Sequence, residues 1–67
     1  MEFLNNGSIC DVLATFPPNY PVDNVIVFGI TQATTNFLSI ANGLATFRND
    51  AEIKIFDCSR IDGLDLN

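Results

Sequence analysis

The segment from Val25 to Cys58 constrains the fold of this chain more than any other feature, because it is a nearly unbroken succession of apolar β-strand patterns. Its β-branched and aromatic residues favour strands over helices. The whole chain has 67 residues, and so short a chain has little room to cover both faces of such a sheet by itself. We therefore expect one all-β domain over residues 1–67, a small antiparallel sandwich or barrel-like meander of about five to six strands, completed by contact between copies.

Turn signals indicate where these strands begin and end. Asn6-Gly7 and Asn42-Gly43 are typical of two-residue hairpin turns, since Asn and Gly tolerate the positive φ angles of a type I′ turn. Prolines in the stretch Pro17–Pro21 remove backbone donors, which predicts an extended or turning connection. The sequence thus predicts strands over residues 2–5, 8–16, 25–30, 34–41, 44–48 and 52–58.

The segment Val25–Ile30 lacks polar alternation, which is the pattern of a central strand covered on both faces. A short amphipathic helix over residues 34–45 is an alternative that the concentration of β-branched residues disfavours. Residues 1–7 are expected to be a short strand or an artificial start that replaces an upstream continuation. Residues 59–67 form a tail that either docks on a neighbouring subunit or frays.

The register of the last two hairpins can be tested against burial, because side chains alternate between the two faces of a strand. A two-residue loop at Asn49-Asp50 would bury Glu52 and Lys54 on the apolar side, so a three-residue loop over residues 49–51 is preferred. The opposing pairs are then Leu38 and Phe47, Ile40 and Ala45, Phe47 and Ile53, and Ala45 and Ile55. The other face carries an Arg48 to Glu52 pair and three apolar side chains, Phe37, Leu44 and Phe56.

The charge balance and composition exclude several classes of function. Eight acidic residues against three basic ones give a net charge of −5, which repels nucleic acid and anionic lipid. No apolar stretch is long enough to span a bilayer, so a soluble protein without membrane insertion is expected. The chain has no His and only two Cys, far apart in sequence, so it lacks a zinc ligand set, and we expect neither metal nor cofactor.

The same composition argues against an enzyme. A nucleophilic Cys needs a neighbouring base, and the chain has no His to supply one. The carboxylates of Asp62 and Asp65 lie in what we expect to be a solvated tail. For Cys10 and Cys58, two half-buried reduced thiols are the favoured interpretation. A disulfide is the alternative if the first and last long strands lie side by side.

The run Leu13–Pro21, followed by the strand Val25–Ile30 and the turn Asn42-Gly43, resembles a pattern of bacteriophage tail-fibre and baseplate receptor-binding proteins. In that pattern a strand ends in a segment like Leu-Pro-x-Gly-Tyr-x-Pro, which Phe16-Pro17-Pro18-Asn19-Tyr20-Pro21 approximates here. The likeness spans Gly7 to Cys58. It implies a β-domain at the C-terminal end of a fibre, assembled as a homotrimer on the virion, and a dimer is the main alternative.

Two groups of residues are candidate sites. An aromatic ring beside amides and carboxylates suits carbohydrate of a host cell surface, and these residues are Tyr20, Asn19, Asp23, Asn24, Asn49 and Asp50. The candidates for contact between copies are apolar: Phe37, Leu44, Phe56, Ile61 and Leu64. We therefore predict a non-catalytic structural or receptor-binding module of a virion. The alternative is a small acidic regulator or inhibitor that pairs with a protein through an exposed strand edge.

Overall fold

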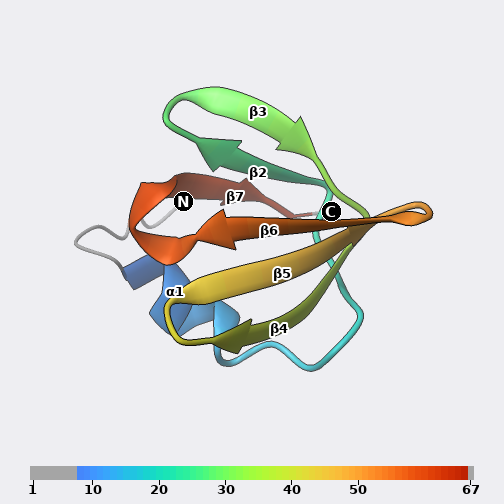
Figure 1. Cartoon of the computed structure of the whole chain (residues 1–67), viewed down its shortest axis with the longest axis horizontal. Helices are drawn as coiled ribbons and strands as arrows, with labels where there is room; N and C mark the ends of the chain where they lie inside the picture. Colours follow the sequence, from blue (N-terminus) through green and yellow to red (C-terminus); the bar gives the residue numbers. More distant parts are fainter. Residues whose placement is uncertain (1–7, 67) are drawn as a thin grey trace.

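Two antiparallel sheets face each other across a small core in the computed structural model, which describes residues 8–66 (Figure 1). One sheet has the order β1-β4-β5-β6, with β1 at Tyr20–Pro21, β4 at Asn36–Ala41, β5 at Leu44–Asn49 and β6 at Glu52–Asp57. The other has the order β3-β2-β7, with β3 at Ile30–Ala33, β2 at Asn24–Val27 and β7 at Ile61–Asp65. A helix, α1 (Ser8–Leu13), and a 3₁₀ turn, η1 (Cys58–Arg60), complete the described chain. The predicted antiparallel all-β class is confirmed. The prediction that residues 59–67 form a tail is wrong for most of this segment, because Ile61–Asp65 forms β7 and pairs with β2.

Two hairpin turns share one backbone conformation although their sequences differ. The predicted Asn42-Gly43 turn is confirmed, with φ angles of 54° and 75° between β4 and β5. The Phe28-Gly29 turn has φ angles of 51° and 75° and joins β2 to β3. The predicted strand over residues 25–30 is therefore too long, because an apolar Phe gives no turn signal. The predicted central position is confirmed, since β2 lies between β3 and β7, but the predicted cover on both faces is wrong, because Val25 is the one buried residue of β2.

The strand predicted over residues 8–16 is wrong, because this segment begins with the helix α1. Ile9 and Leu13 are four positions apart, which places them on one face of the helix, and both are buried. Burying this pair against the sheets outweighs the strand preference of the segment's β-branched residues. The strand predicted at residues 2–5 and the turn at Asn6-Gly7 lie outside the described residues.

The proline-rich stretch turns, as predicted, and then contributes a short edge strand. The backbone N–H of Tyr20 donates to the carbonyl of Pro17 at 3.2 Å, and Asn19 between them has a φ of 69°. Tyr20 and Pro21 then form β1, which pairs with the start of β4. Proline is tolerated in β1 because this strand is the outermost one of its sheet.

The register between β5 and β6 differs by one residue from the predicted one. The loop is Asp50-Ala51, with Asn49 opposite Glu52, so neither predicted loop is present and Arg48 does not face Glu52. The observed opposing pairs are Ala45 and Phe56, Thr46 and Ile55, Phe47 and Lys54, and Arg48 and Ile53. A shift of one residue moves every side chain of β6 to the other face.

A bulge changes the pairing between β4 and β5 as well. Ile40 lies opposite Ala45, as predicted, but Phe37 rather than Leu38 lies opposite Phe47. The register shifts between Phe37 and Ser39, so Leu38 is the extra residue of a β-bulge. A bulge has no signal in the alternation of side chains, so the sequence pattern does not predict it.

Together these shifts exchange the residues that were predicted to be inside and outside. Phe37 is buried and Phe56 packs against the core, so their predicted location on the outer face is wrong. Ile53 and Ile55 are 52% and 59% exposed, so their predicted inward location is also wrong. The observed register places the larger aromatic rings inside, where they remove more apolar area from water.

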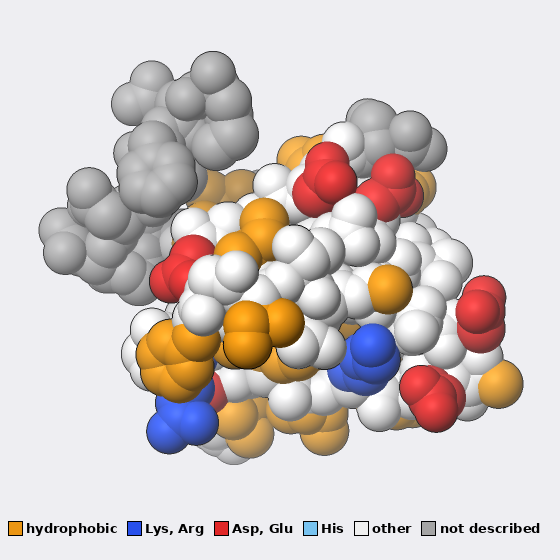
Figure 2. Space-filling model, turned by 90° about the horizontal axis from the view of Figure 1, so that it is seen from above, with side chains coloured by type: hydrophobic (Ala, Val, Ile, Leu, Met, Phe, Trp, Pro, Cys, Tyr) orange, Lys and Arg blue, Asp and Glu red, His pale blue; other side chains and the backbone are white. Residues whose placement is uncertain are grey.

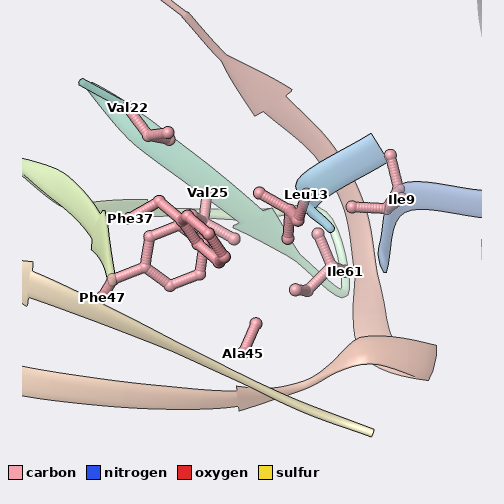
Figure 3. Packing of buried hydrophobic residues seen from close by; sticks show 8 residues of the cluster. All are labelled: Ile9, Leu13, Val22, Val25, Phe37, Ala45, Phe47 and Ile61. Atoms are coloured by element: carbon pink, nitrogen blue, oxygen red, sulfur yellow. The ribbon is translucent and has the colours of Figure 1, made fainter. Parts of the chain in front are cut away.

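The core lies between the two sheets and is closed by α1 (Figure 3). The rings of Phe37 and Phe47 meet edge to face at 5.6 Å between centroids, and the ring of Phe56 lies 5.8 Å from that of Phe47. Thr34, the one buried polar residue of the described chain, donates its hydroxyl to the carbonyl of Val22. The buried apolar residues are Ile9, Leu13, Val22, Val25, Phe37, Ala45, Phe47 and Ile61.

A disulfide joins Cys10 of α1 to Cys58 of η1, with their Cα atoms 5.7 Å apart. The expectation of two reduced thiols is therefore wrong. The sequence argument required two adjacent strands, but here a helix brings Cys10 to the end of β6. Because the bond closes a loop with a sequence separation of 48, chain entropy predicts a stabilisation of about 4 kcal/mol. A covalent cross-link of this kind compensates for the small hydrophobic core of the chain.

Candidate interaction surface

The six residues predicted to bind carbohydrate lie near the connection that joins β3 to β4. Within this connection, Thr34 N–H donates to the carbonyl of Asp23, and the Thr35 hydroxyl accepts from Asp50 N–H. Next to it, Asn36 donates its side-chain amide to the carbonyl of Asn19. These bonds bring Asn19, Tyr20, Asp23, Asn24, Asn49 and Asp50 to one end of the molecule.

Several of these groups already have partners within the chain. The side-chain amide of Asn24 donates to Asp65 Oδ2 at 2.9 Å. The Tyr20 ring is stacked on that of Phe16, with centroids 4.3 Å apart, so one face of the tyrosine is covered. The positive φ angles of Asn19 and Asp50 belong to tight turns. These contacts stabilise this end of the molecule and leave the Tyr20 side chain 37% exposed.

A groove of about 330 Å³ lies beside this end, between the chain that follows α1 and the strand β4. Phe16, which stacks on Tyr20, forms part of its wall. Ser39 is the one lining residue with a polar side chain. The groove is lined by Leu13, Ala14, Phe16, Pro18, Phe37, Leu38, Ser39 and Ile40. Its lining therefore favours apolar groups over the hydroxyls of a sugar.

The five residues predicted for contact between copies are divided between the core and the surface. Phe37 and Ile61 are buried, at 3% and 6% exposure. Phe56 and Leu64 are partly buried and pack against the core. Only Leu44 is a largely exposed side chain. Sequence reasoning also missed other exposed apolar residues. Ile53 and Ile55 were predicted to face inward, and the correct loop length after β5 was the signal needed to find them. Phe28 and Ile30 were predicted in a covered strand but are 67% and 62% exposed.

Leu44, Ile53 and Ile55 lie on the face of β5 and β6 that points away from the core. The register shows this directly, because Ala45 and Phe47 point inward and their neighbours on each strand point outward. We call this the outer face of the four-stranded sheet. On this face three apolar side chains lie beside the polar or charged side chains of Thr46, Arg48 and Asp57.

The outer face ends at an unpaired strand edge. In a two-residue hairpin the residues on either side of the turn, here Asn49 and Glu52, form a hydrogen-bonded pair. Along an antiparallel ladder, hydrogen-bonded pairs alternate with non-hydrogen-bonded pairs, whose backbone groups point away from the partner strand. The bond from Cys58 N–H to the carbonyl of Gly43 fits this alternation. Ile53 and Ile55 therefore direct their backbone N–H and C=O groups away from β5. Among the described residues no strand pairs with this side of β6.

A second exposed feature is the tip of the β2–β3 hairpin. Phe28 is 67% exposed in a left-handed conformation, which is costly for a bulky residue. Its ring lies under the guanidinium of Arg60, with 5.5 Å from Cζ to the ring centroid. Asp62 Oδ2 accepts a bond from Gly29 N–H at 2.6 Å and holds the turn. Figure 2 shows hydrophobic side chains gathered beside basic groups on one part of the surface, with acidic groups around its margin.

Charges near the free edge are also held in place. Lys54 reaches across to the other sheet, where its Nζ donates to the carbonyl of Ala33 at 3.0 Å. Asp57 Oδ1 accepts from both the backbone N–H and the hydroxyl of Ser59, and these bonds lower the pKa of Asp57 below its ordinary value. The three basic residues of the chain, Arg48, Lys54 and Arg60, all fall on β5, β6 and η1.

The described residues offer little for chemistry. Residues 8–66 contain no group of three or more His, Cys, Asp or Glu side chains that could hold a metal ion. No helix within this range is long and apolar enough to cross a bilayer. The arrangement offers instead an apolar sheet face and a strand edge with free backbone groups. Both are features that bind protein.

Comparison of the chain with protein-family models, with curated proteins and with solved structures finds no match.

Proposed function

We propose that this chain is a non-catalytic structural module that acts by associating with copies of itself. The observation that carries the proposal is the position of the outer face directly beside the unpaired edge of β6. An exposed apolar surface is stabilised when a partner covers it, and a free strand edge forms backbone hydrogen bonds with any strand placed beside it. Within residues 8–66 of a single copy, no segment pairs with this edge of β6, and Leu44, Ile53 and Ile55 stay exposed.

The setting of this proposal comes from the sequence resemblance, which suggests a bacteriophage fibre or baseplate. In that setting the resemblance implies association of copies on the virion, as a homotrimer or, in the alternative, a dimer, and the end that carries Tyr20 contacts carbohydrate of the host surface. The Cys10–Cys58 disulfide supports a site of action outside a reducing cytosol, because structural disulfides persist in oxidising surroundings. The partial exposure of the Tyr20 side chain, at 37%, supports the carbohydrate contact.

A second candidate function is a regulator or inhibitor that binds a different protein. The free edge of β6 favours it, because an extended segment of a partner could add a strand there. Ile53 and Ile55 would then contact that partner instead of another copy.

The mass of the folded chain in solution separates these functions. Light scattering over a range of chain concentrations, without reductant, should give a mass of two or three chains if the chain assembles with itself. A mass of one chain at every concentration would contradict self-association and favour the regulator. The same measurement with reductant shows whether assembly requires the Cys10–Cys58 bond.

A further inference from the structure

We propose that β6 pairs with β6 of a second copy in an antiparallel, two-fold arrangement centred on Ile53. This inference rests on the self-association proposed above, and it adds the surface, the symmetry and the register. It makes the assembly a dimer. The two four-stranded sheets would join edge to edge into one continuous sheet.

Two-fold symmetry limits the registers that β6 can adopt with itself. In an antiparallel pair of identical strands related by a two-fold axis, one residue must lie opposite its own copy. Centring the pair on Lys54 places two ammonium groups opposite each other, and like charges in that position are destabilising. Centring it on Ile55 places Ile53 opposite Asp57 of the second copy. Centring it on Ile53 avoids both conflicts.

The register centred on Ile53 is complementary in charge. It places Glu52 opposite Lys54 of the second copy, and the symmetry produces this pair twice. Both are non-hydrogen-bonded pairs, in which opposing side chains approach most closely. Lys54 already donates one bond to Ala33 at 3.0 Å, and an ammonium group has three donors. It can therefore bind Glu52 of the second copy without leaving Ala33.

The backbone and the apolar side chains fit the same register. Ile53 directs its N–H and C=O away from β5, so two copies of this residue can form a hydrogen-bonded pair. Ile55 then lies opposite Ala51 of the second copy, and the Ile53 side chains lie next to each other on the joined outer face. The contact is one strand long and buries less area than a permanent interface, so the dimer is expected to be weak and concentration-dependent.

Charge reversal tests the register. E52K would place two ammonium groups opposite each other across the contact, and K54E would place two carboxylates there. Each single change should therefore raise the dimer dissociation constant about tenfold or more. The double variant E52K/K54E restores opposite charges and should return the constant to within about threefold of the original chain. The matched control is D11K, which changes the net charge as E52K does but replaces an exposed residue of α1, outside the proposed strand pair.

The dissociation constants would be measured by analytical ultracentrifugation, with circular dichroism as the check on folding. Glu52 is exposed and next to a turn, so E52K carries the test even if K54E fails to fold without its bond to Ala33. Weaker dimerisation of E52K, together with unchanged dimerisation of D11K, supports the proposal. Rescue by the double variant does so as well. A dimer that is insensitive to E52K, a double variant without rescue, or a mass of three chains would overturn this inference and leave self-association intact. A monomer at every concentration would overturn both.

Discussion

The inner and outer faces of the β5–β6 hairpin have similar apolar content but opposite roles. On the inner face Ala45, Phe47 and Phe56 contribute to the core. On the outer face Ile53 and Ile55 are exposed. Because alternate residues of the same two strands supply both faces, the register alone decides which side chains hold the monomer together and which remain free for a partner. The comparison teaches that burial, rather than hydrophobicity, separates structural from interaction residues here.

Removing an inner aromatic ring is the strongest way to test this comparison. We expect Phe47→Ala to lower the free energy of unfolding by about 3–5 kcal/mol, because Phe47 is fully buried and contacts two other rings. The matched change on the outer face, Ile55→Ala, should cost less than about 1 kcal/mol. Urea unfolding at low chain concentration measures both. Equal losses would mean that the two faces are not distinct.

The disulfide should have the next largest effect, because it holds α1 over the open side of the inner face. The variant Cys10→Ser with Cys58→Ser is expected to lose about 2–4 kcal/mol. Thermal unfolding with and without reductant provides the measurement. Reductant should lower the midpoint of the original chain and leave the double variant unchanged. An original chain insensitive to reductant would show that the bond does not close the core.

The two similar hairpin turns allow a smaller and reciprocal test. Phe28→Asn should raise the stability by about 0.5–1 kcal/mol, since relief of the left-handed strain exceeds the loss of the contact with Arg60. Asn42→Phe introduces that strain and should cost about 1 kcal/mol. Differential scanning calorimetry would show whether the two variants change the stability in opposite directions. A destabilised Phe28→Asn variant would instead assign the Phe28 ring a structural role.

Asp57, at the end of β6, predicts a small acid-dependent effect. Its hydrogen bonds from Ser59 hold the pKa of Asp57 below the ordinary value of 3.8. A carboxyl with a depressed folded-state pKa stabilises the fold above its unfolded pKa, and this stabilisation is lost as the pH falls through the folded value. Ser59→Ala should therefore raise the pKa of Asp57 and reduce the acid dependence of stability below pH 3.8. An NMR titration of the Asp57 carboxyl tests this, and an unchanged pKa in Ser59→Ala would contradict it.

The sequence predicted those parts of the fold that have local signals. The Asn42-Gly43 turn and the strands on either side of it follow from the conformational freedom of Asn and Gly and from β-branched content. The Phe28-Gly29 turn has no such signal at Phe28. The helix α1 forms because tertiary burial of Ile9 and Leu13 overrides a local preference for strand.

The outer face could not be predicted correctly, because its residues depend on a bulge and a turn that the alternation of apolar and polar residues does not indicate. The bulge at Leu38 and the Asp50-Ala51 turn each move the register by one residue. For this reason Phe37 and Phe56 were predicted to face outward, whereas Ile53 and Ile55 were predicted to face inward. Core volume decides between such registers, and it becomes visible only when both sheets and α1 are placed together.

Amide hydrogen exchange of β6 as a function of chain concentration tests the central claim most directly. The amides of Lys54 and Phe56 bond to β5 in the monomer, so their protection should be constant. Among the described residues of one copy, the amides of Ile53 and Ile55 have no partner strand, so they should exchange rapidly in dilute solution and become protected as the concentration rises. Exchange at Ile53 and Ile55 that stays rapid while light scattering records an oligomer would contradict the claim that β6 is the contact.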